Sequence, residues 1–75
     1  YGISHEEYLN LKEIQNNLCA ICKNISINRN LAVDHNHRTG KIRGLLCTKC
    51  NLGLGYFQDN ILILESTINY LKRDV

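Results

Sequence analysis

The four cysteines of this chain have the clearest chemistry, because they form two C-x-x-C pairs: Cys19, Cys22, Cys47 and Cys50. Such a count permits two disulfides, a redox pair or one metal site. Zinc binds four thiolates in a tetrahedron, and a C-x-x-C turn directs two sulfurs towards the same ion. Because the two pairs use every cysteine of the chain, they predict a closed, structural Zn²⁺ site.

A second group of polar residues lies between the two pairs, in the segment 33–37 (VDHNH), and Asn51 follows the last cysteine directly. The side-chain oxygens of Asp34 and Asn51 suit a hard cation such as Mg²⁺ or Mn²⁺, which also binds phosphate oxygens. His35 titrates near neutral pH and can serve as a general base. The group therefore predicts metal-dependent hydrolysis of a phosphodiester, in which His37 binds a phosphate or orients a neighbour.

Each of these residues also has an ordinary structural explanation. His35 and His37 could be polar loop residues or zinc ligands, although four thiolates already complete a zinc shell. Asn51 could be a helix-capping residue. Strand alternation raises a further difficulty, because it places Asp34 and His35 on opposite faces. Both residues can serve one site only if the strand ends or bulges at that point.

The middle of the chain is more basic than its ends. The net charge of +2 is modest and does not by itself indicate a nucleic-acid partner. Asp34 is the only acidic residue between the first and the last cysteine. Four basic residues that could contact DNA phosphates stand close together in this part of the chain: Arg38, Lys41, Arg43 and Lys49. Solubility is the alternative explanation for these charges.

The pattern of the chain predicts a small α+β fold as the frame for these groups. A capping box of Ser4 and Glu7 predicts a leading helix within 1–18 that ends at Asn16-Asn17. The buried face of that helix is expected to contain Tyr8, Leu11, Ile14 and Leu18. The polar segment 24–30 is expected to be a loop. Strands are expected from 31 and over 42–46, joined by a turn at Thr39-Gly40.

Two further helices are expected after the second cysteine pair. Thr48 is the expected N-cap of a short helix that carries Asn51 in its first turn. The last helix falls within 59–75, with Asp59 or Asn60 as its cap. Its apolar face is expected to join the core and contains Ile61, Leu64, Ile68 and Leu71.

The length of 75 residues allows one domain, and a core of this size usually needs a staple such as a metal. The organisation expected is a single domain over 1–75, with zinc knuckles and the catalytic core over 19–58. The N-terminus does not resemble a signal peptide, and the longest apolar run, 61–64, is too short to cross a bilayer. We therefore expect a soluble protein of a reducing, cytoplasmic compartment, neither secreted nor bound to a membrane.

The run CAIC, followed by LAVDHNHRTGKIRGLLCTKCNLGLG, resembles the recombination endonuclease VII branch of the phage-type HNH, or ββα-metal, nucleases. The resemblance extends from residue 1 to about residue 60, and its D-H-x-H and C-x-x-C-N combination is specific. It implies a β-hairpin and a helix around one divalent ion, with a separate zinc in the four cysteines. It further implies that Asp34 and Asn51 bind Mg²⁺ or Mn²⁺, that His35 is the general base, and that His37 supports catalysis.

The resemblance implies endonucleolytic cleavage of double-stranded or branched DNA, leaving 5′-phosphate and 3′-hydroxyl ends, with a homodimer as one form of assembly. Two features depart from the family's namesake. Leu54 stands where that protein carries an acidic residue, and the chain lacks its long appended helices. The alternatives to a nuclease are a non-catalytic zinc module that binds nucleic acid and a small interaction domain that uses the face of 61–71.

Overall fold

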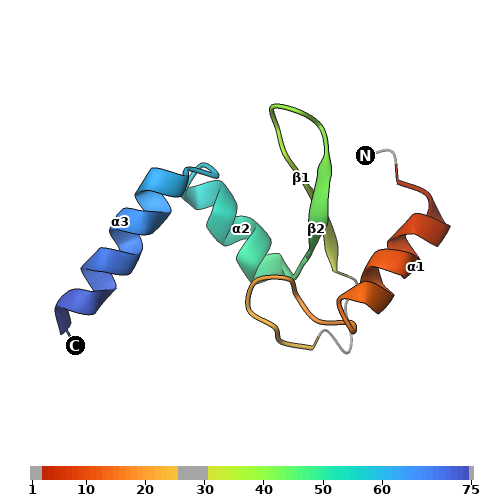
Figure 1. The fold of residues 1–75 in the computed structure, drawn as a ribbon, viewed down its shortest axis with the longest axis horizontal. Helices are drawn as coiled ribbons and strands as arrows, with labels where there is room; N and C mark the ends of the chain where they lie inside the picture. The colour runs from red at the N-terminus through yellow and green to blue at the C-terminus, as the bar shows by residue number, and fades with distance from the viewer. Residues whose placement is uncertain (1–2, 26–30, 75) are drawn as a thin grey trace.

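The computed structural model describes residues 3–25 and 31–74 of the chain. Its order is helix, hairpin, helix, helix, which is the small α+β arrangement predicted (Figure 1). The elements are α1 (His5–Ile14), β1 (Ala32–His35), β2 (Ile42–Leu46), α2 (Thr48–Tyr56), α3 (Ile61–Leu71) and a short 3₁₀ turn, η1 (Lys72–Asp74). The residues 26–30 of the expected loop lie outside the described residues.

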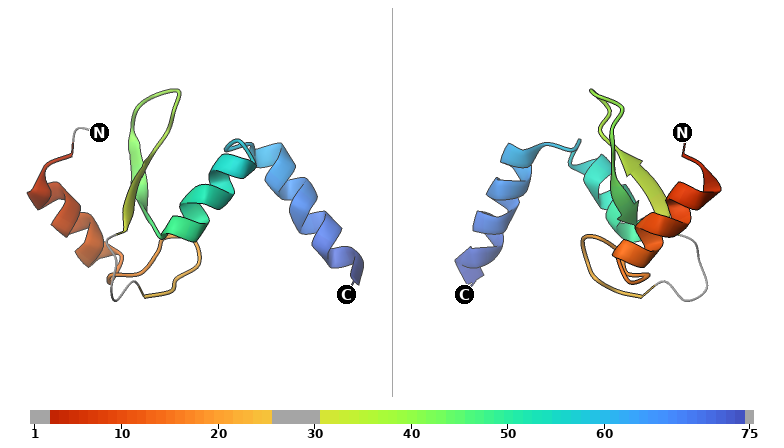
Figure 2. Two further views of the ribbon diagram at one scale, coloured as in Figure 1. Left: turned by 180° about the vertical axis from the view of Figure 1, so that it is seen from behind. Right: turned by 45° about the vertical axis from the view of Figure 1, so that its right-hand side comes forward.

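The antiparallel hairpin of β1 and β2 lies between two helices (Figures 1 and 2). Helix α1 packs against β2, and α2 packs against both strands. Helix α3 extends away from this body and makes its main contacts with η1. The molecule is consequently elongated, with dimensions of 43 × 29 × 17 Å.

Helix α1 begins with the predicted capping box. The Ser4 hydroxyl accepts a hydrogen bond from the Glu7 N–H at 3.1 Å, and the Glu7 carboxylate accepts one from the Ser4 N–H at 3.2 Å. The helix ends at Ile14, before two asparagines in the left-handed region, with φ of 54° and 62°. Asparagine tolerates this conformation better than most residues, so the predicted stop is confirmed.

The prediction that Ile14 belongs to the buried face of α1 is wrong, because its side chain is exposed. The side chains that face the sheet are Tyr8, Leu11 and Gln15, which recur at the helical spacing of three and four residues. The Tyr8 hydroxyl donates to the Leu31 carbonyl at 2.7 Å, while Gln15 reaches β2. Ile14 lies off this stripe and therefore points away from the core.

Gln15 joins α1 to the hairpin through a set of side-chain hydrogen bonds. Its amide nitrogen donates to the carbonyls of Leu18 and Leu45 at 2.8 and 3.0 Å, and its oxygen accepts from the Leu45 N–H at 2.9 Å. A Cβ at Gly44 would lie 3.1 Å from the same oxygen. Glycine at 44 therefore permits the close approach of Gln15 to the strand.

Replacing Gln15 by alanine should reduce the free energy of unfolding by about 1–3 kcal/mol, because the Leu45 N–H and the neighbouring carbonyls lose a buried partner. Chemical denaturation of the zinc-loaded chain measures the change. Asn10→Ala, at an exposed position of the same helix, is the matched control and should cost nothing. Equal stability of the two variants would show that the hydrogen bonds of the Gln15 side chain do not stabilise the fold.

The core of the described residues is small and sits between the hairpin and the first cysteine pair. Its buried members are Cys19, Leu31, Leu45 and Leu46, and partly buried side chains from α1 and α2 pack around them. Among the residues that the structure describes, Leu45 and Cys19 have the fully buried side chains. A core of this size supplies little stability on its own, so the fold needs a further cross-link such as a bound metal ion.

Helix α2 starts one residue earlier than expected, because its N-cap is Cys47 and not Thr48. Cys47 has extended backbone angles (φ −69°, ψ 163°), and its sulfur accepts from the Cys50 N–H at 3.5 Å. Thr48 is already helical. The zinc-ligand candidate thus also begins the helix.

Helix α3 has the predicted Asn60 cap, whose side chain accepts from the Ile63 N–H at 3.1 Å. The prediction that its apolar face is core is wrong, since Ile61, Ile68 and Leu71 are all exposed. The turn before it directs the helix away from the sheet, so the described chain provides nothing to cover that face. No helix among the described residues has the length and apolar character needed to cross a membrane.

Candidate active site and metal centre

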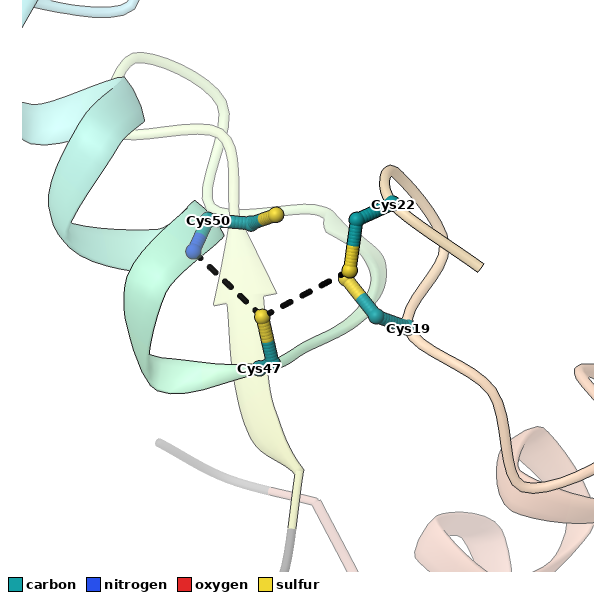
Figure 3. A group of neighbouring side chains, drawn as sticks. All are labelled: Cys19, Cys22, Cys47 and Cys50. Carbon is teal, nitrogen blue, oxygen red and sulfur yellow. Dashed lines mark hydrogen bonds between the residues drawn. The ribbon is translucent and has the colours of Figure 1, made fainter. Parts of the chain in front are cut away.

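The four cysteine sulfurs converge on one point, where the loop after α1 meets the start of α2 (Figure 3). All four lie within 4.8 Å of one another, and the Cys22 and Cys47 sulfurs are 3.8 Å apart. The edge of a tetrahedron with Zn–S bonds of about 2.3 Å is about 3.8 Å, whereas a disulfide requires about 2.05 Å. The cysteines are free thiols, and their arrangement fits a zinc ion.

The thiols of this cluster differ in their affinity for protons. Burial opposes ionisation of Cys19, but hydrogen bonds from backbone groups of Cys47, Cys22 and Ile21 lower its pKa to about 6. Burial raises the pKa of Cys50 to about 12, and hydrogen bonds within the cluster and the charge of Cys19 add to this effect. A bound zinc ion must displace such protons, so acid should weaken metal binding.

A β-bulge solves the problem that alternation posed for Asp34 and His35. Asp34 pairs with Gly44, but His35 pairs with Ile42, so Arg43 is an extra residue in β2. A bulge re-aims the side chains next to it. The sequence required the strand to end or to bulge at this point, and the structure shows both, because β1 also ends at His35. Beyond the bulge, the rings of His35 and His37 lie 4.7 Å apart between centroids, so the two histidines are neighbours where β1 enters the hairpin loop.

Asp34 is buried and bound to an arginine. Its residue exposure is 9 %, and it is the one charged residue in the buried class among those described. Its carboxylate accepts from Arg43 Nε at 2.7 Å and from Arg43 Nη2 at 3.1 Å. This two-pronged contact raises the pKa of the Arg43 guanidinium. Arg43 was predicted to contact phosphate, and the structure gives it an ion pair with the predicted metal ligand.

Sequence reasoning missed the part of Asp59 in this cluster and considered it only as a helix cap. Its Oδ2 accepts from Arg43 Nη2 at 3.3 Å and lies 3.6 Å from His37 Nε2. Nothing in the spacing of Asp59 points to the hairpin, because the contact depends on the turn between α2 and α3. The pairing of Arg43 with Asp34 depends on the bulge, which makes Arg43 an extra residue in β2.

The Asp34–Arg43 pair lies between two cavities. One, of about 570 Å³, is lined by the hairpin loop and the α2–α3 turn, including His37, Arg38, Arg43 and Asp59. The other, of about 240 Å³, is lined by Asp34, Arg43 and Leu54 among others. Arg43 lines both cavities, whereas Asp34 lines only the smaller one.

The remaining predicted site residues lie on α2 and on the hairpin loop. Asn51 is exposed on α2, one helical turn before Leu54. Arg38 and Lys41 are exposed on the hairpin loop, and Lys49 is exposed on α2. The Asn36 side chain shapes that loop by accepting from the N–H groups of Arg38 and Thr39 at 2.8 and 3.1 Å.

The donor chemistry of the cluster fits a divalent cation. Two carboxylates, from Asp34 and Asp59, face one guanidinium, so the cluster carries an excess of negative charge. Each carboxylate oxygen has a second lone pair beyond the one that a guanidinium uses. Carboxylate oxygens are donors that Mg²⁺ and Mn²⁺ prefer.

The chain matches known proteins along nearly its whole length. The family model for recombination endonuclease VII matches residues 1–73. The gene 59 proteins of Mycobacterium phages D29 and L5 are 47% and 44% identical over 75 and 73 residues. These matches cover 97% and 95% of this chain but only 46% and 44% of the phage proteins. The chain thus spans less than half the length of these relatives.

A solved structure shares the fold. The ββα-Me type II restriction endonuclease Hpy99I aligns with a TM-score of 0.69 and 39% identity, over 96% of this chain and 43% of that one. The two strands and the following helix therefore form a ββα-metal fold, with the four-cysteine cluster at the start of that helix. With the family model matched from residue 1 to residue 73, the chain belongs to the recombination endonuclease VII family of nucleases.

Proposed function

We propose that this domain is an HNH-type endodeoxyribonuclease that hydrolyses phosphodiester bonds with one divalent metal and a histidine base. The observation that carries the proposal is the bulge between Asp34 and His35, which joins a buried carboxylate to a pair of neighbouring histidines. A zinc module that only binds nucleic acid needs neither feature. The family match supports the same reaction.

In the proposed reaction, each residue has one task. Asp34 and Asn51 hold Mg²⁺ or Mn²⁺, which stabilises the charge that develops on the phosphate and the leaving oxygen. His35 accepts the proton of the attacking water. His37 lies close to His35 and to Asp59 and supports His35 in this role. Attack of the water on phosphorus, with cleavage of the bond to the 3′ oxygen, leaves a 5′-phosphate and a 3′-hydroxyl. Zn²⁺ in the four cysteines stabilises the fold around this site.

Supercoiled plasmid incubated with the zinc-loaded chain tests the proposal. Nicked or linear DNA should form with Mg²⁺ or Mn²⁺ and not without added metal. Religation of the products by a ligase and extension by a polymerase test for the two predicted ends. Retention of DNA with no cleavage in either metal would favour the binding module. Branched, nicked and linear substrates, with mass measurement in solution, test the predicted DNA form and homodimer.

Arg38 and Lys41 should contact DNA phosphates, because both are exposed on the hairpin loop beside the cluster. Changing both to glutamine should weaken binding to all sequences alike. It should also reduce the slope of log K against log salt by up to about 1.8, or about 0.9 for each lost contact. Fluorescence anisotropy across a salt series measures both effects.

Lys12→Gln is the matched control for this loss of charge, because Lys12 lies on α1, away from the hairpin loop. Its salt slope should equal that of the parent. An altered sequence preference with an unchanged slope in the double variant would indicate base contacts in place of phosphate contacts.

A further inference from the structure

Arg43 divides its guanidinium between two carboxylates on different elements. Nε donates to Asp34 Oδ2, while Nη2 lies 3.1 Å from Asp34 Oδ1 and 3.3 Å from Asp59 Oδ2. Because Nη2 carries two hydrogens, it can donate one to each acid. The same nitrogen therefore ties the strand that carries Asp34 to the turn that carries Asp59.

The charge count of this arrangement favours a second cation. Arg43 is the one permanent cation of this cluster, because His37, 3.6 Å from Asp59 Oδ2, carries a charge only when it is protonated. One guanidinium cannot neutralise two carboxylates, and the side chains of Asp34 and Asp59 are only 11 % and 24 % exposed. Arg43 thus acts as a resident cation on Asp34, in the place where a metal ion would add its charge. Any contact that draws Arg43 towards Asp59 lowers its hold on Asp34.

The backbone places Asp59 for this contact at some cost. Gln58 and Asp59 both adopt left-handed conformations, with φ of 57° and 54°. This conformation is unfavourable for residues other than glycine, somewhat less so for aspartate. The turn is closed by hydrogen bonds from the N–H groups of Gln58 and Asp59 to the end of α2. It directs Asp59 towards Arg43 while α3 leaves the body.

We propose that Asp59 is a positioning residue that acts through Arg43 and sets how freely Asp34 binds the divalent cation. This inference rests on the proposed function, in which Asp34 is a metal ligand. With Asp59 present, Arg43 is shared and Asp34 keeps capacity for the ion. Without the Asp59 carboxylate, Arg43 pairs with Asp34 alone and competes with the ion more strongly.

The test is the affinity of the zinc-loaded chain for Mn²⁺ and Mg²⁺, measured by calorimetry in the absence of DNA. Asp59→Asn should weaken binding by about threefold to tenfold, and Arg43→Gln should strengthen it by a similar factor, as for coupled charges in one network. A purely structural role would make both changes weaken binding. Asp59→Asn in the Arg43→Gln background should have little further effect, because its route of action is gone.

Three results would overturn the inference: weaker metal binding in Arg43→Gln, an undiminished effect of Asp59→Asn in that background, or no effect of Asp59→Asn alone. Thermal melting verifies that each variant is folded. If Arg43→Gln fails to fold, Arg43→Lys replaces it, and its point charge without the fork should reduce the effect of Asp59→Asn. Asp34→Asn separates the proposed function, in which Asp34 binds the metal, from the inference about Asp59. Loss of metal binding there keeps the proposed function even if Asp59 is inert, whereas unchanged binding overturns both.

Discussion

Replacing His35 by alanine should lower the rate of DNA cleavage by about a hundredfold to ten-thousandfold, the usual contribution of a general base. The variant should stay folded, keep its zinc and still bind DNA. The physical reason is the position of His35, which follows the bulge, outside the small core and away from the cysteine cluster. Its loss should remove a proton acceptor while leaving the four buried core residues and the cysteine cluster in place.

Single-turnover cleavage across a metal titration measures this effect and separates His35 from Asp34. His35→Ala should remain slow at saturating Mg²⁺ or Mn²⁺, because metal does not replace a proton acceptor in this scheme. Asp34→Ala should also be slow, but high Mn²⁺ should rescue part of its activity by mass action. His5→Ala, an exposed histidine of α1, is the matched control. Full activity of His35→Ala at saturating metal would remove this histidine from the mechanism.

Changing Cys47 to serine should abolish cooperative thermal unfolding and much of the helical signal. The core of the described chain has only two side chains that are fully buried, too few to offset the conformational entropy of the chain. The binding free energy of a structural zinc is therefore folding free energy. Serine is a good N-cap, so the variant keeps the capping function of Cys47 at the start of α2 and loses the metal ligand.

Circular dichroism with zinc quantification tests this expectation. The parent should hold one zinc and melt cooperatively, while Cys47→Ser should hold less and resemble the chelator-treated parent. Thr48→Ser, the conservative change at the next position, should behave as the parent does. A Cys47→Ser chain that melts like the parent would mean that the frame does not depend on zinc. Lower pH should release the metal from the parent, because protons compete for thiols such as Cys50, whose pKa is about 12.

The local features of the fold could be read directly from the sequence because their causes are local. The C-x-x-C spacing brings the sulfurs together in pairs, the Ser4–Glu7 box begins α1, and the asparagines after Ile14 end it. The hairpin followed from two short apolar runs and a turn. Strand alternation also showed that the strand must end or bulge between Asp34 and His35 if both serve one site, but it did not say which.

The ion-pair cluster was decided by tertiary structure alone. The bulge at Arg43 and the left-handed turn at Gln58-Asp59 together bring Asp59 to the hairpin. Neither the distance along the chain nor the residue types predict that contact. Arg43 consequently looked like a surface cation, although its guanidinium is bound to the buried Asp34.

Whether each apolar side chain is buried or exposed was also decided by tertiary packing and not by the periodicity of the sequence. Periodicity identified an apolar side on α3, but a helical pattern does not say what covers that side, and in the structure α3 leaves the body. On α1, Gln15 faces the sheet where Ile14 was expected, because the paired backbone groups of Leu45 match an amide better than an apolar side chain. The sequence alone therefore determined the metal cage, the hairpin and the candidate chemistry, while the contacts that orient Asp34 required the assembled fold.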